Sequence, residues 1–131
     1  GKGAVTLRHR RLEAETAEVT GAKKAGKVVG STNHGATLKF TDLNLADSKG
    51  VTIAASVGSS AKDSQVEVRL DSPTGPLVAT VGITHTGDWA KSAENKAKLA
   101  PVTGRHDVFL VLTNPKKGGG LMNIDWVQFD R

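Results

Sequence analysis

The sequence contains no cysteine and no tyrosine, and its aromatic residues are limited to three phenylalanines and two tryptophans. Without cysteine there is no disulfide framework and no thiolate chemistry, so the redox compartment is left open. The scarcity of aromatic rings removes the stacking platforms with which many proteins hold single-stranded nucleic acid. These absences exclude several classes of site before any motif is considered.

The sequence also lacks a long apolar run and a charged-then-apolar leader, so we expect no membrane partner. Its 131 residues are 37% hydrophobic and 24% charged, which is typical of a globular protein. We expect one monomeric domain over residues 1–131. The net charge of +5 favours contact with polyanions. Because no helix-turn-helix or zinc-finger spacing is present, we expect no specific nucleic-acid partner.

Short apolar segments with a period of two residues dominate the chain. Val66, Val68 and Leu70 alternate with charged residues, which is typical of a half-buried strand. Similar short runs, separated by turn-forming clusters, occur at residues 5–7, 51–57, 77–83, 108–112 and 124–129. This spacing predicts an all-β fold, an antiparallel β-sandwich or jelly roll. We expect a strand and then a loop over residues 12–19, and a mobile loop at the glycine-rich residues 116–120.

Glu13 and Glu15 are two residues apart in a predicted strand, so both carboxylates would point to the same side. Two adjacent like charges favour a cation between them, and carboxylate oxygens suit calcium. Asp125, in the predicted last strand, could supply a third carboxylate. The alternative is two solvated glutamates, because no short calcium motif such as an EF-hand loop is present.

The sequence gives little support for a catalytic site. The histidines, at positions 9, 34, 85 and 106, are scattered and give no zinc-binding pattern. No Gly-x-Ser-x-Gly or His-Glu-x-x-His motif is present. Any domain of this size has enough acids for a glycosidase pair, but a small sandwich leaves little room for a deep site. We therefore expect a protein without catalytic residues.

Trp89 lies in the turn-like segment GITHTGDWAKS rather than in an apolar run. An indole in such a turn either covers the edge of the core or stands in solvent as a contact surface. An exposed indole can stack on the C–H face of a sugar, and a nearby amide such as Asn123 can bind its hydroxyls. Protein contact is the other functional interpretation.

Six segments, taken in order, resemble carbohydrate-binding module family 6. This family has a jelly-roll fold like that of galactose-binding domains, and its members are appended to polysaccharide-degrading enzymes. The segments are Leu12-Glu13-Ala14-Glu15, Asn33-His34-Gly35, the run from Val66 to Leu77 with Arg69-Leu70-Asp71-Ser72-Pro73-Thr74-Gly75, Thr86-Gly87-Asp88-Trp89, the run from Val102 to Val111, and Asn123-Ile124-Asp125-Trp126.

The resemblance implies a role for each matching residue. Trp89 would stack on a sugar ring in a cleft built by loops at one end of the sandwich, and Asn123 would bind sugar hydroxyls there. Trp126 would be a core residue of the last strand. A structural calcium ion would be held by Glu13, Glu15 and Asp125, with a backbone carbonyl near Lys27.

The sequence departs from the family pattern at three places. Ser31 stands where a second aromatic residue usually completes the cleft, and Glu18 is the candidate for a glutamate contact in a shortened loop. Gly35-Ala36-Thr37 replaces a Gly-Asp-aromatic segment that can serve a second site on a sheet face. Since one aromatic stacking contact is worth about 1–3 kcal/mol, by analogy with stacked bases, we expect weakened binding.

The resemblance therefore implies a noncatalytic module that targets a polysaccharide or oligosaccharide for a linked glycoside hydrolase. The chain would be one domain of a larger protein, secreted or periplasmic. The alternative is a structural or protein-interaction β-sandwich that has lost sugar binding.

Overall fold

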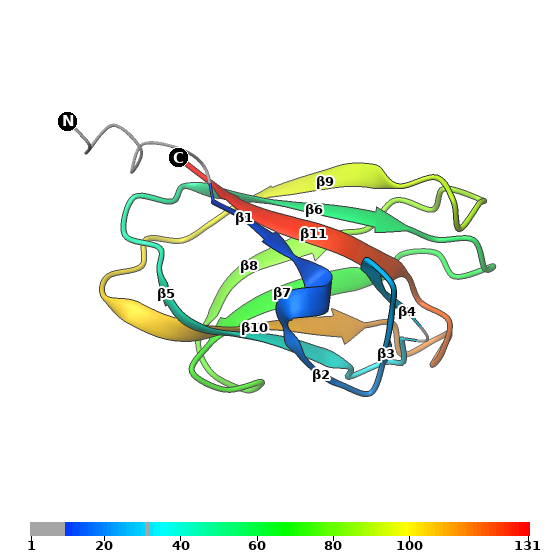
Figure 1. Cartoon of the computed structure of the whole chain (residues 1–131), viewed down its shortest axis with the longest axis horizontal. Helices are drawn as coiled ribbons and strands as arrows, with labels where there is room; N and C mark the ends of the chain where they lie inside the picture. The colour runs from blue at the N-terminus through cyan, green and yellow to red at the C-terminus, as the bar shows by residue number, and fades with distance from the viewer. Residues whose placement is uncertain (1–9, 31) are drawn as a thin grey trace.

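A computed structural model of the chain describes residues 10–30 and 32–131. The strand predicted at residues 5–7, His9 and Ser31 lie outside these residues. Within them the chain forms a sandwich of two antiparallel sheets, as predicted (Figure 1). No helix in the described part is long and apolar enough to cross a membrane.

The first sheet has the strand order β3-β4-β11-β6-β9, with β1 also paired to β11, and the second has the order β2-β5-β10-β7-β8. The first sheet consists of β1 (Arg10–Glu13), β3 (Lys23–Ala25), β4 (Val28–Gly30), β6 (Gly50–Ser56), β9 (Ala93–Lys98) and β11 (Asn123–Asp130). The second consists of β2 (Glu18–Thr20), β5 (Thr37–Asn44), β7 (Gln65–Leu70), β8 (Leu77–Gly82) and β10 (Arg105–Thr113).

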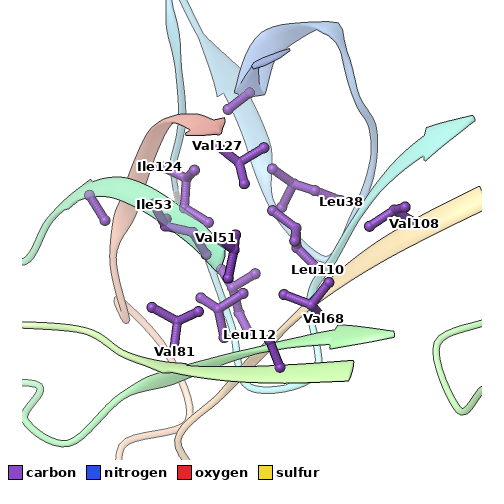
Figure 2. Close-up of a cluster of buried hydrophobic side chains, with 14 of the residues drawn as sticks. Leu38, Val51, Ile53, Val68, Val81, Val108, Leu110, Leu112, Ile124 and Val127 are labelled. Atoms are coloured by element: carbon purple, nitrogen blue, oxygen red, sulfur yellow. The ribbon is translucent and has the colours of Figure 1, made fainter. Parts of the chain in front are cut away.

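The core lies between the two sheets and is built mainly from aliphatic side chains, with Phe40, Phe129 and Met122 among them (Figure 2). Val66, Val68 and Leu70 all point into it, which confirms the alternation predicted for β7. From the facing sheet, Val51 and Ile53 of β6 meet them with no exposed surface. Burying these β-branched and leucine side chains supplies the main favourable free energy of folding.

The segment 12–19 is a strand, a turn and a second strand. β1 ends at Glu13, a 3₁₀ turn η2 follows at Ala14–Thr16, and β2 begins at Glu18. The turn is closed by the Ala17 N–H, which donates to the Ala14 carbonyl oxygen at 3.0 Å. The strand predicted at the beginning of this segment is confirmed, whereas the region predicted as a loop contains the turn η2 and the start of β2, a strand of the second sheet.

Trp126 is buried, as predicted, although it is not part of the main hydrophobic cluster between the sheets. A register shift between Ile124 and Trp126 turns the indole to the outer face of the first sheet, opposite Ala54. There the guanidinium carbon of Arg11 lies 3.9 Å from the ring centroid. This cation–π contact joins the first strand to the last one and explains why so large a ring is only 9% exposed.

One end of the sandwich gathers the segments 32–36, 57–64, 83–92 and 114–122, which link strands of both sheets. In Figure 1 this end lies at the right, where β6 ends and β11 begins. The Asp71–Leu77 connection and the start of β10 lie at the opposite end. The predicted sugar-contacting residues Trp89 and Asn123 both lie at the first of these ends.

Candidate functional site

Trp89 lies in the connection between β8 and β9, and its side chain is 43% exposed. Its indole covers Gly58, in the loop that follows β6. A Cβ atom at Gly58 would lie 2.6 Å from the indole Cγ and Cδ1 atoms, so only glycine permits this close approach. The indole is therefore supported on one side by backbone while much of the ring remains open to solvent.

Backbone and hydroxyl hydrogen bonds hold the Trp89 loop against the end of β6. The Gly87 N–H donates to the Val57 carbonyl oxygen at 2.9 Å, and the Val57 N–H donates to Thr86 Oγ1 at 2.9 Å. Gly87 has a φ of +77°, a conformation that glycine adopts without strain. Thr86 Oγ1 also donates to the Asp88 carbonyl oxygen at 3.0 Å. These contacts fix the direction from which Trp89 reaches Gly58.

Asn123 is the first residue of β11, and it pairs with Ser56, two residues before Gly58. Its side chain lies against Gly30, where an added Cβ would come within 2.7 Å of the Asn123 Oδ1 atom. The side-chain amide has no hydrogen-bonding partner in the described residues and is partly exposed. This amide and the exposed indole lie at the same end of the sandwich, and they offer a donor–acceptor pair and an apolar surface, the two kinds of contact that suit a sugar ring.

The glycine-rich segment near residue 118 is bound to its neighbours, which differs from the mobile loop that was predicted. Ser59 Oγ donates to the Gly120 carbonyl oxygen at 2.6 Å, and the His34 N–H donates to the Gly118 carbonyl oxygen at 2.8 Å. Asn33 and Gly119 form a β-bridge. The loops around Trp89 and Asn123 therefore support one another.

Glu18, the other predicted sugar contact, is not brought to this site. It pairs with Lys39 in the β2–β5 ladder, and its carboxylate lies 3.8 Å from the Lys39 ammonium on the outer face of the second sheet. In the described residues the Glu18 carboxylate contacts Lys39 and makes no hydrogen bond or ion pair with Trp89 or Asn123. The structure adds Gly58 and Gly30 to the candidate site. The sequence did not indicate these glycines, because their importance comes from the side chains that lie against them, Trp89 on Gly58 and Asn123 on Gly30.

The predicted calcium ligands lie on neighbouring elements at one corner of the first sheet. Glu13 pairs with Trp126, the residue after Asp125, and the turn η2, which contains Glu15, contacts both β11 and β4. Lys27 immediately precedes β4. The two glutamates do not share one strand, as had been predicted, because β1 ends at Glu13.

The side chains at this corner do not by themselves form a metal cage. Across residues 10–30 and 32–131, no group of three or more histidine, cysteine, aspartate or glutamate side chains is arranged to hold an ion. The donor types still suit calcium, since carboxylates from Glu13, Glu15 and Asp125 can be combined with backbone carbonyl oxygens. The fit of this corner to calcium is partial.

The three described histidines serve local hydrogen bonds rather than a common centre. His34 Nδ1 accepts from the Asn114 N–H at 2.9 Å, and His85 Nε2 donates to the Ser59 carbonyl oxygen at 2.7 Å. His106, at the opposite end of the sandwich, contacts the Asp71 carboxylate at 2.9 Å. That hydrogen bond is the main cause that raises the pKa of His106, with a smaller contribution from the Thr103 carbonyl.

Comparison with known proteins places this arrangement in a family. The sequence model described as "Carbohydrate binding module (family 6)" matches residues 9–131. An endo-1,4-beta-xylanase A of Thermoclostridium stercorarium is 28% identical over 121 residues, which cover 90% of this chain but 22% of the xylanase. An arabinoxylan arabinofuranohydrolase of Paenibacillus polymyxa is 41% identical over 64 residues, covering 49% of this chain and 10% of that enzyme.

A solved structure shares nearly the whole fold. The family 6 carbohydrate-binding module from Clostridium cellulolyticum, solved in complex with xylose, superposes with a TM-score of 0.87 at 28% identity, covering 94% of this chain and 98% of that one. This chain spans only about a fifth of the xylanase that it matches, where 22% is covered. The match of the family model and the shared jelly-roll sandwich agree, and the chain belongs to carbohydrate-binding module family 6, a family of noncatalytic sugar-binding modules.

Proposed function

We propose that this module binds a xylan-type polysaccharide through Trp89 and Asn123 and holds a linked glycoside hydrolase on its substrate. The observation that carries the proposal is the half-exposed indole of Trp89, which is fixed on Gly58 at the same end of the sandwich as the Asn123 amide. The choice of xylan is supported by the xylanase and arabinoxylan enzymes among the relatives and by the xylose complex of the similar module.

A single exposed indole suits a targeting role better than tight capture. One stacking contact contributes on the order of 1–3 kcal/mol by analogy with stacked bases, and each neutral hydrogen bond adds about 0.5–1.5 kcal/mol. Weak binding of this kind still keeps an attached enzyme close to a polymer, because a tether raises the effective concentration without new contacts. The proposed protein is therefore a multidomain enzyme in which this module acts as a monomeric unit.

The proposal includes a compartment and a structural ion. Polysaccharides of this kind lie outside the cell, so a secreted or periplasmic location follows from the ligand. Calcium would be held at the corner formed by Glu13, Glu15 and Asp125, with the backbone near Lys27. The ion would join β1 and η2 to the last strand, so its role would be structural.

Affinity electrophoresis through gels that contain one polysaccharide each tests the proposed ligand. We expect retardation in xylan and arabinoxylan gels, and little or none in gels with a β-1,3-glucan or a soluble cellulose derivative. Migration that is unchanged by every polysaccharide would contradict the proposal and favour a protein-interaction sandwich. Retardation by glucan but not by xylan would keep the site and replace the ligand.

A further inference from the structure

A lysine ammonium lies at the rim of the site. Lys117 Nζ donates to Ser60 Oγ at 3.2 Å, and both side chains are exposed. The Lys117 N–H donates to the side-chain oxygen of Asn114 at 3.2 Å. The buried Asn114 amide in turn donates to the Lys62 carbonyl oxygen at 3.0 Å. The backbone that carries the ammonium is therefore tied to the same loop that carries Ser60.

Lys117 lies near the indole because both side chains contact the segment Gly58–Ser60. Gly58 lies under the indole of Trp89, and Ser59 Oγ donates to the Gly120 carbonyl oxygen at 2.6 Å. Ser60 Oγ accepts a hydrogen bond from the Lys117 ammonium. Residues two apart are separated by at most about 7 Å, the spacing of an extended chain, and Ser59 and Ser60 lie in a bend. A sugar residue stacked on Trp89 would therefore have a neighbouring substituent or residue within reach of the Lys117 ammonium.

The Lys117 ammonium forms no ion pair in the described residues, although the exposed Asp63 lies in the same loop as Ser60. No acidic side chain in the described residues lies within salt-bridge distance of the Lys117 ammonium. The nearest acid in the Trp89 loop, Asp88, uses one carboxylate oxygen to accept from the Ala90 N–H at 2.8 Å. An ammonium has three N–H donors, and a serine that accepts a hydrogen bond keeps its own O–H to donate. Lys117 and Ser60 thus offer two adjacent donors, one of them charged.

We propose that Lys117 and Ser60 bind the carboxylate of a uronic acid carried by the polysaccharide, so that the module prefers acidic over neutral xylan. The ammonium and the hydroxyl would each donate to one carboxylate oxygen, a charge-assisted arrangement. The inference rests on the proposed function, because it needs a sugar chain seated on Trp89. The net charge of +5 further favours the approach of an acidic polymer.

Titration calorimetry with one xylan in two forms tests the inference: the native polymer with its uronic acids, and the same polymer after the carboxyl groups have been reduced. We expect wild-type protein to bind the acidic form about two- to five-fold more tightly, the range of an exposed ion pair. Lys117→Gln should remove this preference and leave binding to the reduced polymer unchanged. Ser60→Ala should lower the preference in the same direction.

Lys116→Gln is the matched control, because it removes the same charge from an adjacent exposed residue that makes no contact with Ser60. Equal losses in the two lysine variants would show general attraction of charge and overturn the inference, as would equal wild-type affinity for both polymers. Failure to bind either polymer would overturn the proposed function as well. Trp89→Ala should lose both forms, so the two hypotheses fail in different ways.

Discussion

The indole of Trp89 rests on Gly58 so closely that a Cβ at that glycine would lie 2.6 Å from the ring. The contact joins the loop after β6 to the loop before β9. Two hydrogen bonds hold these loops together: the Val57 N–H donates to Thr86 Oγ1, and the Gly87 N–H donates to the Val57 carbonyl oxygen. An aromatic ring that is fixed before the ligand arrives loses less conformational entropy on binding. Gly58 is therefore part of the binding surface although it offers no side chain.

Gly58→Ala should impair binding while Trp89 is still present. Because the new methyl group would overlap rigid ring atoms, the indole must move, and we expect the affinity for xylan to fall by about tenfold or more, the loss of roughly one stacking contact. Gly82→Ala is the control, since a Cβ there has open space. Affinity electrophoresis of both variants checks the prediction, which is contradicted if Gly58→Ala migrates like wild type.

Asn123→Ala should weaken binding less completely than loss of the indole. In the part of the chain that the structure describes, the amide makes no internal hydrogen bond, so its removal costs only the bonds to the ligand, about 0.5–1.5 kcal/mol each. We expect a loss of affinity of about two- to ten-fold with an unchanged melting temperature. Asn44→Ala, at the opposite end of the sandwich, is the matched control for calorimetry. Equal affinity of these two variants would remove Asn123 from the site.

Calcium removal tests the proposed ion at Glu13, Glu15 and Asp125. An ion that binds only the folded state stabilises it by mass action, so chelation should lower the melting temperature measured by calorimetry. Asp125→Ala should abolish the response to chelator. Elemental analysis of the purified protein must accompany the melts. If the protein holds no ion and its melting curve ignores both calcium and chelator, the glutamates are simply solvated.

The pH dependence of stability should reveal the contact between His106 and Asp71. Both ring nitrogens of His106 face acceptors, Asp71 Oδ1 at 2.9 Å and the Thr103 carbonyl oxygen at 2.8 Å, so the protonated ring fits best. Its pKa is raised in the folded state. The stabilisation is therefore complete below the unfolded pKa of about 6.5 and is lost as pH rises through the higher folded pKa.

Thermal melts across that range give the measurement. We expect the melting temperature of wild type to fall more steeply above about pH 6.5 than that of His106→Gln, which has no proton to lose. His34→Gln is a useful control because its Nδ1 accepts a hydrogen bond from Asn114 and makes no contact with a carboxylate. Parallel curves for wild type and His106→Gln would contradict the assignment.

Local patterns in the sequence predict most of the sandwich, but they do not predict how strands are combined. The alternation in β7 identifies its buried face, whereas β9, which reads Ala-Glu-Asn-Lys-Ala-Lys, has no large apolar residue. Its inward residue Asn95 is satisfied by the Ile53 carbonyl oxygen and the Thr84 N–H, partners that only the folded chain supplies. Polar strands of this kind depend on tertiary hydrogen bonds that periodicity does not encode.

The candidate site shows the same limit. Trp89 and Asn123 could be identified from residue type and family pattern, since indole and amide groups have evident sugar chemistry. The position of Glu18 could not be predicted, because it depends on the register in which β2 pairs with β5, which sets Glu18 opposite Lys39. Gly58 and Lys117 acquire their roles from loops that meet only in three dimensions, through Trp89 and Ser60.

The affinity of Trp89→Ala for xylan, measured by titration calorimetry beside its free energy of unfolding, tests the central claim most directly. Because the indole is exposed rather than part of the core, we expect binding to be lost while the free energy of unfolding changes by less than about 1 kcal/mol. Leu77→Ala, which trims the other large exposed apolar side chain of the described residues, should bind like wild type. A Trp89→Ala protein that binds with full affinity would contradict the account, and so would a destabilisation of about 3–5 kcal/mol, the cost of removing a buried aromatic side chain.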